Sequence, residues 1–232
     1  MKNITLIIIS LFLTGFSFKS GNKTIMLNSK SFNGNSYVLM TFEKNSMNFE
    51  VKKRKNVNDD FYMNANFFTP SGKEIGEVII NGKKINKKVS FGGYFYSNGG
   101  QGHVSLYKRP SNVKFCVQTK FVGIVNGKIN KRVTRYGLNK NGAYRTLIGE
   151  TKKGDIILIH SNNLSLVSMD EICEFGIEKG MINGILFDGG SSVDIGLNST
   201  DVNYSFKSLP SVIKKMIGTP EPPIYIIGNF KN

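Results

Sequence analysis

Short apolar segments separated by glycine and asparagine turns constrain the fold of this chain more than any other feature. Residues 23–51 alternate between apolar and polar side chains and contain the turn signal Asn33-Gly34-Asn35. Residues 77–80 and 83–85 flank Asn81-Gly82, a two-residue turn that is typical of a β-hairpin. Further apolar segments predict strands at 61–68, 147–149, 156–160 and 224–227.

One segment has the pattern of a helix. Ser168 and Glu171 form a capping-box signature, and an apolar stripe follows as far as Lys179, where Gly180 ends the helix. A short apolar strand, 185–187, comes next. Many strands with few helices predict an α+β fold, in which a single domain forms around a mixed, mainly antiparallel sheet.

The N-terminus has the form of a secretory signal. Lys2 precedes an apolar run over residues 4–16, which is short for a membrane span, and small residues at positions 15 and 17 favour cleavage before Phe18. We therefore expect a signal peptide over 1–17 and one domain over 18–232. This predicts a secreted, periplasmic or cell-envelope protein.

The formal net charge of +15, from 31 basic and 16 acidic residues, favours anionic partners such as acidic glycans, teichoic-type polymers or an anionic cell surface. The lysines are scattered, and neither helix-turn-helix nor zinc-finger spacing occurs, so no specific nucleic acid is expected as a partner. The sequence does not give the oligomeric state.

Cysteine and histidine are scarce. Cys116 and Cys173 could pair in an exported protein, but Cys173 also falls on the predicted buried side of the helix, where a free thiol packs well. Both interpretations stay open. His103 and His160 are far apart, with no cysteine or acidic cluster beside them, so we expect no metal and no cofactor.

Three short motifs carry residues suited to chemistry. The first, Asn64-Ala65-Asn66-Phe67-Phe68, places asparagines in an apolar segment, where burial without partners would be costly. The second, Arg145-Thr146-Leu147-Ile148-Gly149, places a guanidinium before a strand, where it can bind phosphate or carboxylate. The third, Phe187-Asp188-Gly189-Gly190-Ser191-Ser192, places a carboxylate and an amide-rich turn after a strand. Each motif alone is weak evidence for a site.

In this order and spacing, the three motifs resemble those of the phosphodiester glycosidase family. Its members have Asn-Gly-Gly-Phe-Phe, then Arg-Thr-x-Ile-Gly, then a helix, then Leu-Asp-Gly-Gly-Gly-Ser. The resemblance extends over roughly residues 61–230. Ala65 and Asn66 replace two glycines of the family pattern, and Ser191 replaces a third.

The resemblance implies a hydrolase that cleaves a sugar 1-phosphodiester at the anomeric C–O bond, on a phosphorylated or anionic glycan. It implies catalytic roles for Asp188, Arg145 and Asn64. Asp188 would support positive charge at the anomeric carbon or activate water, and Arg145 would stabilise the departing phosphate. Candidate substrate-binding residues are Thr146, Gly189, Gly190, Ser192 and His103, the last of which lies in a glycine-rich loop and also suits acid-base chemistry.

Two points stay open at the level of sequence. A second carboxylate could be Glu74, Glu77, Glu150 or Asp194. The alternative function is non-catalytic: a module that binds glycans or phosphodiesters, or a structural protein of an envelope or virion with the same fold.

Overall fold

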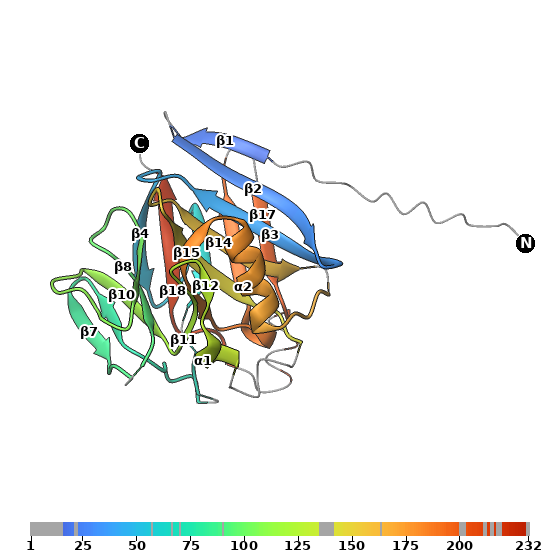
Figure 1. Ribbon diagram of the computed structural model, residues 1–232. Coiled ribbons are helices and arrows are strands. Elements are labelled where there is room, and N and C mark those ends of the chain that lie inside the picture. The colour runs from blue at the N-terminus through green and yellow to red at the C-terminus, as the bar shows by residue number, and fades with distance from the viewer. Residues whose placement is uncertain are drawn as a thin grey trace, which may run out of the picture.

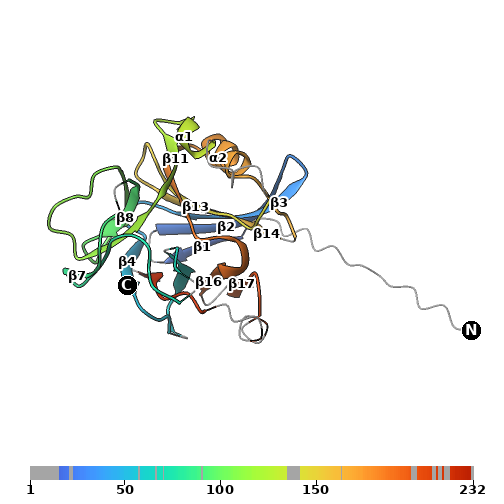
Figure 2. The same ribbon diagram turned by 90° about the horizontal axis from the view of Figure 1, so that it is seen from below.

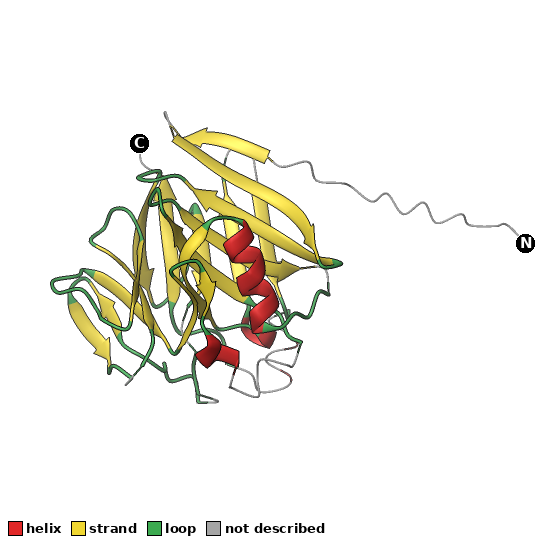
Figure 3. Ribbon diagram, viewed as in Figure 1, coloured by secondary structure: helices red, strands yellow, loops and turns green. Residues whose placement is uncertain are grey.

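The computed structural model describes residues 16–20, 23–56, 58–65, 67–69, 71–89, 91–134, 142–162, 164–199, 203–210, 213, 216 and 220–230. Most of these residues lie in strands (Figure 3). An eight-stranded sheet forms the centre, in the order β1 (Phe16–Ser20), β2 (Lys23–Phe32), β3 (Asn35–Phe42), β14 (Ile156–Asn162), β13 (Thr146–Thr151), β15 (Met181–Phe187), β11 (Phe121–Val125), β12 (Lys128–Ile129).

Two five-stranded sheets accompany the large sheet. One has the order β17 (Asn203–Lys207), β16 (Asp194–Asn198), β5 (Phe61–Asn64), β18 (Tyr225–Phe230), β4 (Met47–Lys52). The other has the order β7 (Lys83–Asn86), β6 (Val78–Ile80), β10 (Phe115–Thr119), β8 (Gly93–Ser97), β9 (His103–Leu106). We call the first of these the β16 sheet and the second the β10 sheet.

The sheets and helices form layers. Helix α2 (Met169–Glu178) and the four-residue α1 (Lys131–Thr134) lie on one side of the large sheet, while β16 and β17 lie on the other (Figures 1 and 2). One apolar core fills the space between α2 and the large sheet, with Leu147, Ile172 and Phe175 among its buried side chains. A larger core, which includes Ile148, Phe61 and Phe95, joins the large sheet to the two smaller ones.

The predicted α+β domain with few helices is confirmed in outline, but the fold is mainly β and its strands are distributed over three sheets. The mixed pairing that we expected is not found, because each strand pair within the described residues is antiparallel. Helix α2 joins β14 to β15, and these two strands run in the same direction. β13 lies between them and pairs antiparallel with both, so they form no parallel ladder.

Local turn chemistry accounts for the hairpins and for the helix. Asn33 and Gly34 have φ of 50° and 79°, and Asn81 and Gly82 have φ of 51° and 74°, the left-handed values that a two-residue hairpin turn requires. Ser168 caps α2 by accepting a hydrogen bond from the Glu171 amide at 3.1 Å. These sequence predictions are confirmed.

The predicted strand 61–68 is shorter than expected. β5 ends at Asn64, and the Ala65 amide then donates to the Ile224 carbonyl at 3.0 Å. Phe68 forms an isolated bridge with Glu74 instead of continuing the sheet. Directly after Asn64, the backbone of Ala65 bonds to Ile224 and Asp188. These partners are distant in the sequence, so the local pattern does not reveal where the strand ends.

Both cysteines are buried and free, so the structure favours the second of the two interpretations of Cys116 and Cys173. Burial raises the pKa of the Cys116 thiol to about 12 and also raises that of Cys173. Neither thiol is therefore a ready nucleophile at neutral pH.

The predicted signal peptide falls largely on residues 1–15, which lie outside the described residues. The predicted cleavage point before Phe18 lies within β1, the edge strand of the large sheet. In the described part of the chain, no helix is long and apolar enough to span a membrane.

Candidate active site

The third motif forms a sharp turn at the end of β15. The strand ends at the buried Phe187, and a short 3-10 turn, Gly190–Ser192, follows Asp188 and Gly189. The Gly190 amide donates to the Tyr144 carbonyl at 2.8 Å. A Cβ atom at Gly189 would lie 2.3 Å from that same carbonyl oxygen, so only glycine allows this close approach.

The second motif lies directly beside this turn. Thr146 pairs with Phe187 in the ladder between β13 and β15, so Arg145 and Asp188 occupy the next opposing positions beyond the strand ends. Beyond the Thr146–Phe187 pair, the Gly190 amide still donates to the Tyr144 carbonyl, so the two segments stay adjacent. The register therefore brings the guanidinium-bearing residue and the carboxylate-bearing residue together.

The backbone of Arg145 is fixed by β14. Its amide donates to the Ser161 hydroxyl at 3.1 Å, and its carbonyl accepts from the Ser161 amide at 3.0 Å. Its Nε donates to the Val167 carbonyl at 3.4 Å, in the segment before α2. Desolvation lowers the pKa of Arg145, although a guanidinium stays protonated in proteins. A partly desolvated cation of this kind attracts a phosphate more strongly than an exposed one.

The first motif closes the arrangement from the β16 sheet. Asn64 is fully buried, and its Nδ2 donates to the Asp188 carbonyl at 3.2 Å. Its Oδ1 accepts a hydrogen bond from the Asp194 amide at 2.9 Å. The Asp188 amide in turn donates to the Ala65 carbonyl at 3.2 Å. The structure thus brings Asn64, Arg145 and Asp188 together from two sheets, with Asn64 bonded to backbone groups on both sides.

The smaller residues of the predicted site have different surroundings. Thr146 is fully buried, and its hydroxyl has no hydrogen-bond partner within the described part of the chain. Ser192 is buried and donates its amide to the Gly189 carbonyl at 3.2 Å. Ser191, which replaces a family glycine, is exposed, so its side chain points away from the packed interior.

His160, which we did not assign to the site, is the cross-strand partner of Thr146. Its Nδ1 donates to the Ser161 carbonyl at 3.1 Å, so its Nε2 accepts from the Tyr204 hydroxyl at 2.6 Å. Burial lowers the pKa of His160 to about 4, with the Ser161 bond acting in the opposite direction. His160 is therefore uncharged at neutral pH, and it pairs with the residue that directly follows Arg145.

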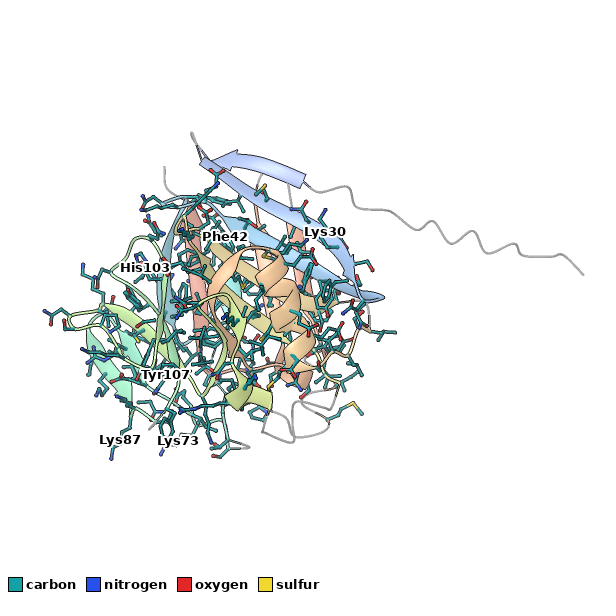
Figure 4. The ribbon with its side chains drawn as sticks, viewed as in Figure 1. Lys30, Phe42, Lys73, Lys87, His103 and Tyr107 are labelled. Carbon is teal, nitrogen blue, oxygen red and sulfur yellow. The ribbon has the colours of Figure 1, made fainter. Side chains whose placement is uncertain are left out.

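The structure does not bring His103 together with the three motifs. His103 lies in the β10 sheet, where its label appears in Figure 4, and its Nδ1 is 3.3 Å from a Glu150 carboxylate oxygen. Glu150 is five residues along β13 from Arg145, which corresponds to about 16 Å of strand. His103 is thus near the opposite end of that strand.

The four candidates for a second carboxylate are also separated. Glu150 pairs with His103, and the buried Glu77 contacts Lys84 at 2.9 Å and Arg109 at 3.1 Å in the β10 sheet. Glu74 lies opposite Phe68, beside the first motif. Asp194 is joined through its backbone to Asn64. Glu74 and Asp194 therefore belong to segments that contact the first motif.

No three His, Cys, Asp or Glu side chains are grouped to hold a metal ion among the residues that the structure describes. The arrangement at the strand ends offers instead a guanidinium, a carboxylate and a glycine turn. These are groups that bind and polarise an anionic substrate directly.

A family model for phosphodiester glycosidases matches residues 58–214, more than half of the chain and all three motifs. This chain belongs to the phosphodiester glycosidase family. The resemblance inferred from the motifs is therefore confirmed.

Curated relatives match a part of the chain. The N-acetylglucosamine-1-phosphodiester alpha-N-acetylglucosaminidases of Bos taurus and Homo sapiens are each 27% identical to it over 103 residues. In both cases the match covers 43% of this chain and 18% of the relative. The chain thus corresponds to a small part of these longer proteins.

Solved structures share the fold over most of the chain. The zebrafish N-acetylglucosamine-1-phosphodiester alpha-N-acetylglucosaminidase catalytic domain, auto-inhibited by its pro-peptide, has a TM-score of 0.67 and 16% identity, covering 96% of this chain and 85% of that one. A hypothetical protein from Synechocystis has a TM-score of 0.66 and 11% identity, covering 90% and 62%. A candidate exported protein from Burkholderia pseudomallei has a TM-score of 0.52 and 8% identity, covering 88% and 74%.

Sequence reasoning missed the residues whose hydrogen bonds fix Arg145 and the glycine turn in place. Ser161 bonds both backbone groups of Arg145, while the carbonyls of Val167 and Tyr144 bind the guanidinium and the Gly190 amide. Two of these contacts are made by backbone carbonyls, which leave no trace in side-chain patterns. Ser161 follows a predicted strand, but nothing in its local sequence indicates its partner.

Proposed function

We propose that this protein hydrolyses a sugar 1-phosphodiester at the bond between the anomeric carbon and its oxygen. Membership of the family supports a phosphodiester glycosidase-like hydrolase. The observation that carries the proposal is the register that sets Arg145 opposite Asp188, next to the glycine turn. N-acetylglucosamine 1-phosphodiesters, which name the curated relatives, are the first substrates to test.

The leaving group determines what the site must supply. A departing phosphate monoester is a weak base, so it needs little proton donation and mainly needs stabilisation of the negative charge that it gains. Arg145 provides a planar cation whose backbone is fixed by Ser161. The glycine turn at 189–190 contributes backbone that can approach the phosphate closely.

Asp188 supplies the charge of opposite sign. Cleavage of a glycosidic C–O bond passes through a transition state with positive charge on the sugar ring, which a carboxylate stabilises. Asp188 either supports this charge or accepts a proton from the attacking water. Asn64 acts as a positioning residue, because its amide bonds the backbones of Asp188 and Asp194.

We further propose that the protein acts outside the cytoplasm on anionic glycans. The signal-like N-terminus and the net charge of +15 support this location and this class of partner. The fold shared with a candidate exported protein agrees with it.

The experiment uses purified protein from residue 18 onward and a synthetic N-acetylglucosamine 1-phosphodiester, with release of reducing sugar as the readout. Wild type should turn over, and Arg145→Ala should lose about 10²- to 10³-fold in kcat/KM. Arg132→Ala removes an exposed arginine from α1 and serves as the matched control with wild-type rates. Equal rates for Arg145→Ala and wild type would refute the phosphate role. Binding of the substrate without turnover would favour the non-catalytic alternative.

A further inference from the structure

A cation-rich hollow lies on the face of the β16 sheet that carries Tyr225 and Asp194. Its volume is about 440 Å³, and its lining residues are Lys53, Arg54, Lys55, Asp194, Lys207, Glu221, Pro222, Pro223 and Tyr225. Four cations meet two carboxylates there, which leaves an excess of two positive charges. None of the roles assigned to the three motifs uses this surface.

A buried carboxylate organises the hollow. Asp194 is fully buried, and its carboxylate accepts hydrogen bonds from Lys55 Nζ at 2.8 Å and from the Tyr225 hydroxyl at 2.9 Å. Lys55 Nζ also lies 3.6 Å from the centre of the Tyr62 ring, and Lys207 Nζ is 3.8 Å from Asp194. Lys55 is therefore held in one place, as a binding site requires and as a freely solvated surface lysine is not.

Two further cations are available for a ligand. Lys53 and Arg54 are exposed and take part in no ion pair within the described part of the chain. They flank the hollow from the segment just after β4. Exposed cations beside a fixed cation form a setting suited to phosphate, with Arg54 able to bind two oxygens at once.

A second hollow adjoins the first and shares Lys55 with it. Its volume is about 460 Å³, and Lys55, Asn56, Tyr62, Asn198 and Asn203 line it. Three asparagines provide amide donors and acceptors, which suit the hydroxyl groups of a sugar. Residues suited to phosphate and residues suited to sugar hydroxyls thus line adjoining hollows, and Lys55 lines both.

This surface connects to the candidate active site through one side chain. Asn64 bonds the Asp188 carbonyl with its Nδ2 and the Asp194 amide with its Oδ1. The backbone of the hollow's central carboxylate is therefore separated from the third motif by a single asparagine. The two regions are thus joined through the protein interior by the buried Asn64 side chain.

We propose that these two hollows bind one sugar–phosphate unit of a polymer in which sugars are joined by phosphodiesters. The proposal rests on the proposed function and deepens it, because it makes the substrate a polymer. One unit of the polymer is cleaved at the candidate active site, and a unit remote from the scissile bond occupies the hollows. Binding at the hollows itself does not require turnover, so it can be tested separately.

The test uses Asp188→Asn protein, to suppress turnover, and a five-unit oligomer of N-acetylglucosamine 1-phosphate. Titration calorimetry at several salt concentrations gives the affinity and its salt dependence. Removing two exposed cations, Lys53→Gln with Arg54→Gln, should weaken binding about fivefold to tenfold and make the salt dependence shallower. The matched control removes two exposed lysines near the β10 sheet, Lys87→Gln with Lys88→Gln, and should bind as the parent does; Figure 4 shows Lys87 at the outer end of the molecule.

A second variant tests the sugar hollow. Asn203→Ala should weaken binding of the glycosyl phosphate oligomer about threefold and leave binding of inorganic polyphosphate of equal length unchanged. Equal affinities of parent and Lys53→Gln/Arg54→Gln protein would overturn the proposal, as would equal loss of both polymers in Asn203→Ala. Equally tight binding of a DNA oligonucleotide with the same number of phosphates would also overturn it. If wild type hydrolyses no phosphodiester but these binding differences appear, the proposed function fails and the site remains.

Discussion

Arg145 and Asp188 oppose one another one position beyond the Thr146–Phe187 pair, where β13 begins and β15 ends. Their relative placement is thus set by the register of two central strands and not by a loop. Ser161 holds the Arg145 backbone, and Asn64 holds the Asp188 carbonyl. A site fixed by the central sheet in this way is organised before substrate arrives, as stabilisation of a transition-state charge requires.

Asn64→Ala should reduce both stability and turnover. The substitution removes an acceptor from the Asp194 amide and a donor to the Asp188 carbonyl, both in a fully buried position. Leaving a buried polar group unpaired costs about 1–3 kcal/mol, which urea unfolding followed by circular dichroism would measure. Because Asn64 positions Asp188, kcat should fall more than KM rises. A raised KM with an unchanged kcat would mean that Asn64 contacts substrate directly.

Gly189 and Gly190 should respond differently to alanine. At Gly189 a Cβ would lie 2.3 Å from the Tyr144 carbonyl, so the turn must move away from Arg145. At Gly190 a Cβ would meet nothing within 4 Å, and the cost is mainly that of a left-handed φ of 60°, about 1 kcal/mol. Kinetic assays should therefore show a loss of at least tenfold in kcat/KM for Gly189→Ala and a smaller loss for Gly190→Ala. The reverse order would contradict the role of the close approach to Tyr144.

The sequence predicts local features of this fold well and long-range ones poorly. Hairpin turns such as Asn33-Gly34 and the Ser168 cap depend on a few adjacent residues, so they can be identified directly. The division into three sheets cannot, because it depends on strand partners such as β5 with β16, which lie more than 130 residues apart. The expected mixed pairing was wrong for the same reason, since only tertiary structure shows that β13 separates β14 from β15.

The same contrast between local and long-range features holds for the candidate site. The family motifs name Asn64, Arg145 and Asp188 as candidates, and the structure places these three residues in neighbouring segments. His103 was chosen for its glycine-rich surroundings, but it lies beside Glu150, far along β13. Local composition identifies a loop that could carry chemistry, but it does not say which end of a strand the loop will reach.

His160 should make stability depend on pH. Its pKa is about 4 in the folded protein and near 6.5 in the unfolded chain, so the unfolded state binds the proton first as the pH falls. Stability is therefore full above about pH 6.5 and declines below it, by about 2 kcal/mol between pH 7 and pH 5.

Urea unfolding at the two pH values measures this effect. His160→Gln should remove most of this pH dependence, whereas His103→Gln, which alters the other histidine, should retain it. Loss of the dependence in His103→Gln instead would show that the buried imidazole is not its source.

Hydrolysis in water enriched in ¹⁸O tests the central claim most directly, because it reports which bond breaks. Cleavage at the anomeric carbon places the label in the released sugar, and cleavage at phosphorus places it in the phosphate. We predict that mass spectrometry of products from an N-acetylglucosamine 1-phosphodiester will find ¹⁸O in the sugar, and that Asp188→Asn will abolish its release. Label in the phosphate, or undiminished release of labelled sugar by Asp188→Asn, would contradict the account.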